Sequence, residues 1–271
     1  MGLGRAEGSG VSVPKAVLWV GWLALLMMQV PLIHTVWVSF SPDMLLTPPV
    51  SDWSFRWYLA FMEDPQWSQA AARSLVTGVL AAVVAVPTGT MAALGLRSLA
   101  VLSRTAALAL LLAPACVPAV ALGLGLLQAA HALGVAGGWA VLVFAHALLG
   151  LPLVVLLARM GLSARLAELE AAARGLGAGP MLVAWRVTLP LIAPWLSAAA
   201  VAVFVISLND AVVAVFVCGP DTETLPVVAW RQLRHAAGPL VAVAGTVTLA
   251  ISVLAGLFMI KRPERRRDAP E

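Results

Sequence analysis

The residues that could carry chemistry in this chain are few, and most of them stand outside its long apolar stretches. Asp210 is the only acid placed within such a stretch. An ionisable side chain in these surroundings is costly and marks a functional site unless a partner explains it. In one interpretation, Asp210 and Asn209 line a polar path through the protein. In the other, Asp210 is structural and is either hydrated or paired with Arg231 or Arg234.

Side-chain patterns typical of enzymes and metal sites are missing from the sequence. The four histidines form no H-E-x-x-H pattern, and the two cysteines lie in apolar surroundings without metal-site spacing. There is no G-x-S-x-G motif. The sequence also lacks G-x-x-x-x-G-K-[ST], the loop that cradles ATP phosphates. We therefore predict no catalysis, no metal and no cofactor, and we expect His146 to hydrogen-bond a neighbouring helix.

The most informative polar segment covers residues 161–189. Ser163 is a good helix N-cap, and the Ala, Leu and Glu residues that follow it favour a helix. Gly175 is a natural helix stop, and Pro180 can begin a second short helix. Pro190 then opens the next apolar stretch. We expect a compact knob of two short helices, which is either an ordinary structured loop or a docking element for another subunit.

Several charge-free runs are long enough to cross a lipid bilayer. Of the 271 residues, 61% are hydrophobic and 11% are charged, whereas a soluble domain carries roughly 25% charged residues. A hydrocarbon core of about 30 Å needs about 20 helical residues. The run Thr105–Ala158 is too long for one span, so we expect it to reverse at Gly134, Gly137 and Gly138. The predicted spans are residues 15–39, 70–96, 105–130, 139–160, 190–217 and 238–260, with outer loops at 40–68 and 218–237.

The predicted fold class is therefore an all-α integral membrane protein with six transmembrane helices. We divide it into an N-terminal part (1–69), a core (70–260) and a basic tail (261–271). Placing both termini in the cytoplasm satisfies the positive-inside rule, because only four basic residues then lie outside: Arg56, Arg73, Arg231 and Arg234. The tail is interpreted as an anchor near anionic lipid, and we expect no binding to nucleic acid.

The polar segment also carries a recognisable pattern. Its residues are Glu170, Ala171, Ala172, Gly175, Leu189 and Pro190. This pattern resembles the EAA loop of binding-protein-dependent ABC importer permeases of type I. Three further stretches resemble the spermidine/putrescine-type permeases of that family: Ser207–Asp210, Phe216–Pro220 and Thr224–Pro226. The resemblance covers roughly residues 70–260.

The resemblance implies a MetI-like fold and a permease subunit that forms half of a translocation pathway. It implies that Glu170, Ala171, Gly175 and Pro190 serve to dock a separate cytoplasmic ATPase dimer. It also implies a second permease subunit and a periplasmic or extracellular substrate-binding protein. The expected location is the bacterial cytoplasmic (inner) membrane.

A polyamine-like cation is the first substrate expected from the resemblance, followed by ferric ion and thiamine-like or other small organic cations. Two positions differ from the polyamine group. No acid follows Pro118, and Asn209 stands where that group favours an acid. An ion-coupled secondary transporter is the alternative function, but it usually needs several acids or broken helices in the membrane. The sequence offers Asp210 alone.

Overall fold

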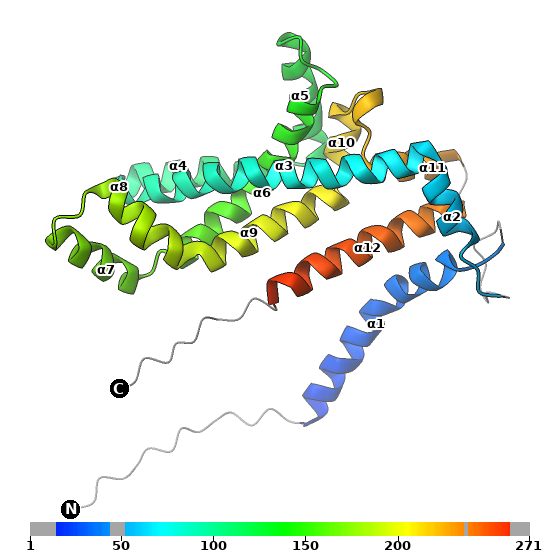
Figure 1. Ribbon diagram of the computed structural model, residues 1–271, viewed down its shortest axis with the longest axis horizontal. Helices are drawn as coiled ribbons and strands as arrows, with labels where there is room; N and C mark the ends of the chain where they lie inside the picture. Colours follow the sequence, from blue (N-terminus) through cyan, green and yellow to red (C-terminus); the bar gives the residue numbers. More distant parts are fainter. Residues whose placement is uncertain (1–14, 44–51, 236–237, 261–271) are drawn as a thin grey trace, which may run out of the picture.

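The computed structural model describes residues 15–43, 52–235 and 238–260. Within these ranges the chain is helical between its turns, and it contains no strand beyond one isolated bridge between Gly137 and Cys218. The helices in Figure 1 are α1 (Lys15–Ser39), α2 (Arg56–Glu63), α3 (Pro65–Gly95), α4 (Val101–Cys116), α5 (Ala119–Ala132), α6 (Trp139–Gly161), α7 (Ala164–Gly175), α8 (Pro180–Val183), α9 (Leu189–Asn209), α10 (Val212–Val217), α11 (Leu225–His235) and α12 (Pro239–Ile260). The predictions for residues 1–14 and 261–271 lie outside the described residues, and the division into three parts stays a prediction.

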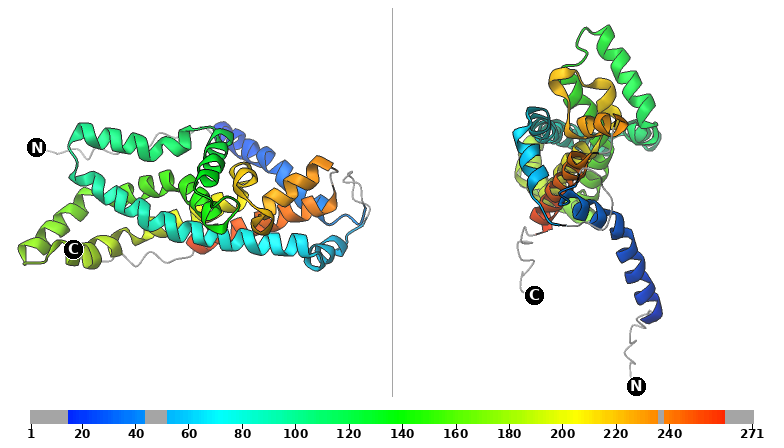
Figure 2. Two further views of the ribbon diagram at one scale, coloured as in Figure 1. Left: turned by 90° about the horizontal axis from the view of Figure 1, so that it is seen from above. Right: turned by 90° about the vertical axis from the view of Figure 1, so that its right-hand side faces the viewer.

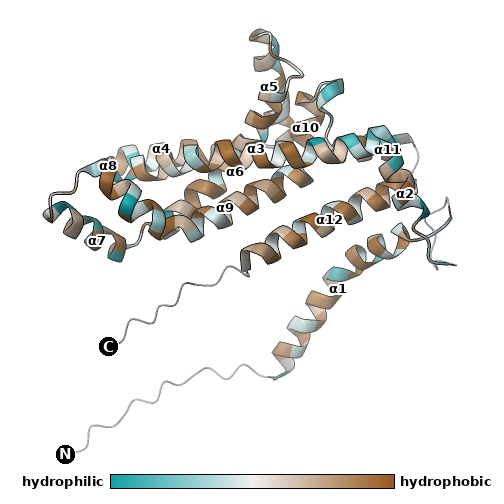
Figure 3. Ribbon diagram, in the orientation of Figure 1, coloured by the Kyte–Doolittle hydropathy of each residue, from teal (hydrophilic) through white to brown (hydrophobic). Residues whose placement is uncertain are grey.

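Five helical stretches of the described chain are long and apolar enough to cross a membrane. They are α1, α3, α6, the continuous stretch Pro180–Asn209 and α12. Helices α4 and α5 qualify only together, as a pair bent by 101°. The prediction of six spans is confirmed when this pair counts as one span. Apolar residues run along most of these helices (Figure 3), and α1 leaves its apolar side chains open, as a lipid-facing helix does.

The centre of the bundle is formed by α3, α6 and α9, which pack on one another more extensively than any other helices. Their shared core is built mostly from small side chains: Ala81, Ala85, Ala147, Val154, Ala199 and Val203. Gly150 of α6 shows how close the packing is, because a Cβ atom there would lie 2.6 Å from Val203 of α9. Small residues of this kind let membrane helices approach each other closely.

The predicted helix over residues 105–130 is wrong, because the chain bends sharply at Val117. Pro118 disfavours helical dihedrals at the residue before it, and Val117 adopts extended dihedrals (φ −81°, ψ 134°). As a result, α5 stands out from the bundle (Figure 2) and packs against α10. The predicted reversal is confirmed, since Gly134 and Gly137 both adopt positive φ between α5 and α6.

The predicted helix over residues 190–217 is also interrupted. α9 ends at Asn209, Asp210 is extended, and the short α10 follows. The two predicted outer loops contain structure as well. The segment 40–68 includes α2 and the first turn of α3, where the Asp64 carboxylate accepts a hydrogen bond from the Gln66 backbone N–H at 2.7 Å. The segment 218–237 includes α11.

Candidate functional site

The polar segment between α6 and α9 has the predicted form of two short helices. The Ser163 hydroxyl caps α7 by accepting a hydrogen bond from the Leu166 N–H at 3.3 Å. α7 continues through Gly175, and the residue with left-handed dihedrals is Gly177 (φ +88°). The helix therefore ends at the predicted Gly175, and the left-handed residue follows two positions later. α8 begins at Pro180 and continues through a π-helical turn, Ala184–Thr188, into α9.

This segment lies at one end of the bundle and extends beyond the packed helices (Figures 1 and 2). The first residues of α1 and the last residues of α12 are directed toward the same end of the bundle (Figure 1). In α7, only Leu166 and Glu170 are buried. Ala171, Gly175 and the first-turn Pro190 of α9 are exposed. Of the four residues assigned to docking, three are thus accessible and Glu170 is not.

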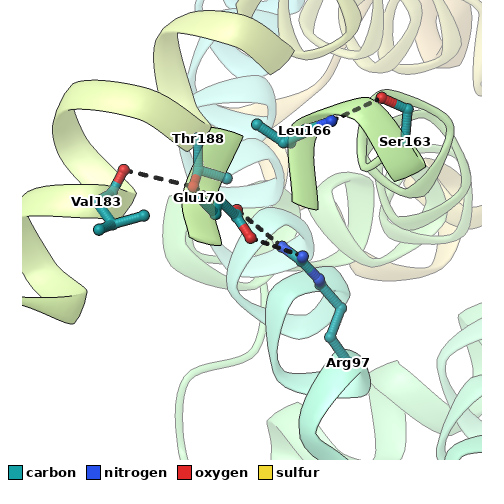
Figure 4. A network of polar contacts seen from close by, with 6 residues as sticks. All are labelled: Arg97, Ser163, Leu166, Glu170, Val183 and Thr188. Carbon is teal, nitrogen blue, oxygen red and sulfur yellow. Dashed lines mark hydrogen bonds and ion pairs between the residues drawn. The ribbon is translucent and has the colours of Figure 1, made fainter. Parts of the chain in front are cut away.

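Glu170 points inward and holds α7 to two other elements (Figure 4). Its residue exposure is 4%. Arg97, in the 3-10 turn Leu96–Ser98 after α3, donates from Nη1 to Oε1 at 3.0 Å and from Nη2 to Oε2 at 2.7 Å. The Thr188 hydroxyl in the π turn donates to Oε1 at 2.7 Å. The hydrogen bonds from Arg97 lower the pKa of the Glu170 carboxyl below its ordinary value.

Sequence reasoning missed Arg97 and Thr188 as partners of Glu170. Arg97 lies 73 residues before Glu170, so no local spacing links them. One signal was present: Arg97 is the first charge after the charge-free run that forms α3. A carboxylate that the fold brings next to Arg97 is the expected partner of its guanidinium group.

A second group of polar residues lies where α9 breaks. The Asp210 carboxylate accepts hydrogen bonds from the backbone N–H groups of Val213 (3.4 Å) and Ala214 (3.0 Å), so it caps α10. Its side chain is 12% exposed, and its Oδ2 lies 3.7 Å from Nε2 of His146 in α6. Neither suggested pairing, with Arg231 or with Arg234, is among the ion pairs of the described residues, and Arg231 pairs with Glu223 instead. A role for Asp210 in a pathway stays a prediction.

His146 and Asn209 connect this break to two neighbouring helices. His146 is fully buried, and its Nδ1 lies 2.5 Å from the Ser207 hydroxyl of α9, which confirms the predicted bond to a neighbouring helix. Nε2 of His146 has no hydrogen-bond partner among the described residues. The Asn209 amide donates to the Val205 carbonyl at 2.8 Å and to the Ser252 hydroxyl of α12 at 3.4 Å, and its side chain is exposed.

Where α5 and α10 project from the side of the bundle (Figure 1), hydrogen bonds join loops that are distant in the sequence. The Thr222 hydroxyl donates to the Gly137 carbonyl at 3.0 Å and accepts from the Gly219 N–H at 2.8 Å. The Leu225 N–H donates to the Ser74 hydroxyl of α3 at 2.7 Å. These bonds tie the loop after α10 to both the α5–α6 turn and the core helix α3.

Residues 85–267 match the family model described as the binding-protein-dependent transport system inner membrane component. The chain is 31% identical over 259 residues to the putrescine transport system permease protein PotI of Escherichia coli (strain K12), with 90% of each chain covered. It is 29% identical over 199 residues to the spermidine/putrescine transport system permease protein PotC of the same organism, with coverage of 73% and 75%.

Two solved structures share the fold. The crystal structure of a bacterial ABC transporter that imports the acidic polysaccharide alginate aligns with a TM-score of 0.65 at 16% identity, covering 92% of this chain and 97% of that one. A bacterial alginate ABC transporter in complex with an alginate pentasaccharide-bound periplasmic protein aligns with a TM-score of 0.67 at 15% identity, with coverage of 90% and 93%. Together with the helical bundle and the loop that carries Glu170, these similarities establish that the chain belongs to the binding-protein-dependent transport system inner membrane component family and is a multi-pass permease subunit of an ABC importer.

Proposed function

We propose that this permease forms half of an inner-membrane pathway for a polyamine-like cation and that α7 and α8 dock it to a cytoplasmic ATPase. The observation that carries the proposal is the position of α7 and of the turn that joins it to α8, which extend beyond the packed helices at one end of the bundle. A subunit without an ATP-binding loop of its own needs such an accessible element to receive movement from a motor.

The charges at the two ends support a cytoplasmic position for α7. Lys15 begins α1, and Arg97, Arg104, Arg165 and Arg186 lie at the α7 end of the bundle. The far end carries fewer basic residues, in α2, α3 and α11. Because cytoplasmic loops are enriched in Lys and Arg, the α7 end is assigned to the cytoplasm. Both termini of the described chain then face the cytoplasm, and α2 and α11 face the periplasm.

The surface of α7 and α8 has the chemistry of a protein interface. Outside the packed core it exposes Leu169 (45%), Leu176 (90%), Met181 (70%) and Leu182 (51%). Exposed large apolar side chains outside the packed core are candidates for interaction sites. We call these four residues the docking patch. Its proposed occupant is one subunit of an ATPase dimer, and a second permease subunit would present an equivalent patch to the other ATPase.

The substrate class is supported by relatives whose names specify putrescine and spermidine/putrescine transport. Asp210 supplies a partly exposed carboxylate at the α9 break. A carboxylate in a low-dielectric path attracts a cation strongly. We propose that a periplasmic binding protein delivers the cation to the α2–α11 end and that Asp210 and Asn209 line its route.

Reconstituted transport tests this proposal. Proteoliposomes should contain this permease, its partner permease and the ATPase, with the cognate binding protein and radiolabelled putrescine on the periplasmic side. We expect uptake that requires both ATP and binding protein and that continues when ion gradients are collapsed. Uptake driven by an ion gradient without the ATPase would favour a secondary transporter instead. Competition with spermidine, thiamine and ferric ion would then rank the substrates.

A further inference from the structure

The carboxylate of Glu170 joins three separate parts of the chain at the α7 end of the bundle. It belongs to α7, and its hydrogen-bond donors come from the turn after α3 and from the π turn that leads into α9. Arg97 approaches in the bidentate geometry that makes guanidinium–carboxylate pairs strong and directional. Three hydrogen bonds of 2.7–3.0 Å thus meet on one side chain.

The position of Glu170 makes it a poor candidate for direct contact with another subunit. Glu170 is 4% exposed and Thr188 is 2% exposed, so a partner protein cannot reach this carboxylate without displacing α7. Both carboxylate oxygens already accept hydrogen bonds from within the chain. The accessible side of α7 instead carries Leu169, and the exposed Leu176 follows directly after the helix.

Few other contacts hold α7 in place. Leu166 is the only other buried residue of this helix. At its end, Gly177 adopts left-handed dihedrals, and the flanking Gly175 and Gly179 have no neighbouring atoms around their Cβ positions. The covalent connection to α8 is therefore a turn with little lateral support. The bonds at Glu170 form the principal polar attachment of α7 to the membrane-spanning helices.

Arg97 lies in the turn that directly follows α3, Thr188 directly precedes α9, and both helices belong to the core of the bundle. α3 and α9 pack against each other and against α6. Thr188 lies at the last position of a π-helical turn, a local distortion that is frequent at functional sites. A displacement of α7 would therefore act on α3 through Arg97 and on α9 through Thr188 at the same time.

We propose that Glu170, Arg97 and Thr188 form an internal joint that transmits movement of the docking patch to α3 and α9, and that Glu170 is a positioning residue which does not itself contact the ATPase. This inference rests on the proposed function, because it takes the docking patch as the place where the ATPase binds. It separates two roles within one loop: exposed apolar residues bind the motor, and the buried carboxylate passes its motion on.

The test compares assembly with coupling in the complete importer. Glu170→Gln removes the charge of the joint at nearly constant shape, and Glu168→Gln is the matched control, since Glu168 is an exposed acid of the same helix. Each variant is co-purified with the ATPase, and both ATP-driven uptake and binding-protein-stimulated ATP hydrolysis are measured. We expect Glu170→Gln to co-purify at the wild-type level, to lose roughly tenfold in uptake and to lose the stimulation of hydrolysis. Glu168→Gln should match the wild type in all three.

A charge exchange keeps the test valid if single variants fold poorly. Arg97→Glu should fail in uptake, and combining it with Glu170→Arg should restore part of the uptake if the two side chains act through each other. If Glu170→Gln no longer co-purifies with the ATPase while Arg97→Glu shows normal uptake, the proposed joint is rejected. Glu170 would then contact the ATPase directly. Failure of the wild-type chain to co-purify with the ATPase would instead reject the docking proposal itself, so the two failures are distinguishable.

Discussion

The Oδ2 atom of Asp210 lies 3.7 Å from Nε2 of His146, yet the carboxylate is held by backbone N–H groups of α10. This distance is longer than a hydrogen bond. The imidazole is anchored through its other nitrogen, Nδ1, beside the Ser207 hydroxyl. Asp210 thus has two separable properties: oxygen atoms that cap a helix, and a negative charge beside a buried histidine at a break in a core helix.

Replacing Asp210 separates these two properties. Asp210→Asn keeps an oxygen that can cap α10 but removes the charge, so we expect a melting temperature close to that of the wild type and uptake reduced by roughly tenfold or more. Asp210→Ala removes the cap as well and should cost about 1 kcal/mol of stability. Melting by fluorescence-detected size exclusion and uptake in proteoliposomes measure the two effects. Asp221→Asn, at an exposed acid of the loop between α10 and α11, is the control. Uptake at the wild-type level in Asp210→Asn would show that the charge of Asp210 has no role in the pathway.

Close packing of the core helices predicts a size limit at Gly150. An added Cβ atom would lie 2.6 Å from the Val203 side chain, so Gly150→Ala forces α6 and α9 apart and should cost about 1–3 kcal/mol. Gly256 of α12 has no atom within 4 Å of its Cβ position. Gly256→Ala should therefore be neutral or slightly stabilising in the same melting assay. Equal effects of the two variants would contradict the close contact between α6 and α9.

The sequence was sufficient to predict the long, regular features of the fold. The predicted bounds of the first, fourth and last spans lie within one residue of α1, α6 and α12, because a charge-free apolar run of about 20 residues has few alternatives in lipid. The cap at Ser163 was also predictable, since capping depends on neighbouring residues. These features share one property: their causes lie within a few residues of the effect.

The features that were missed depend either on residues that lie far apart in the sequence or on local effects that oppose each other. The bend at Val117 depends on a single proline, and prolines elsewhere in these spans do not break their helices: Pro31, Pro87 and Pro152. The break at Asp210 was hidden by the apolar residues on both sides of it. The partner of Glu170 could not be found from spacing, because Arg97 meets it only after α3, α6 and α7 have packed.

The lowered pKa of Glu170 predicts how the joint responds to acid. A carboxyl group with a depressed pKa in the folded protein contributes stability above its unfolded pKa of about 4.3, and it loses that contribution as the pH falls through the folded value. Wild-type protein should therefore melt higher than Glu170→Gln at pH 7, and the difference should shrink below about pH 4. Paired melting curves across pH 3–7 measure this difference. A constant gap, or one that widens in acid, would show that the Arg97 pair does not stabilise the folded state.

The orientation of the docking patch can be tested at its most exposed residue. Leu176 is 90% exposed, so Leu176→Cys should fold normally. The background for this variant is Cys116→Ala with Cys218→Ser, which removes the two native thiols. If α7 faces the cytoplasm, a membrane-impermeant maleimide should label the thiol in inverted vesicles and not in intact cells, and addition of the ATPase should slow the labelling. Trp230→Cys in α11, also exposed, is the matched control and should react from the periplasmic side alone. Labelling of both thiols from the same side would contradict the six-span topology, because α7 and α11 lie at opposite ends of the bundle (Figure 1).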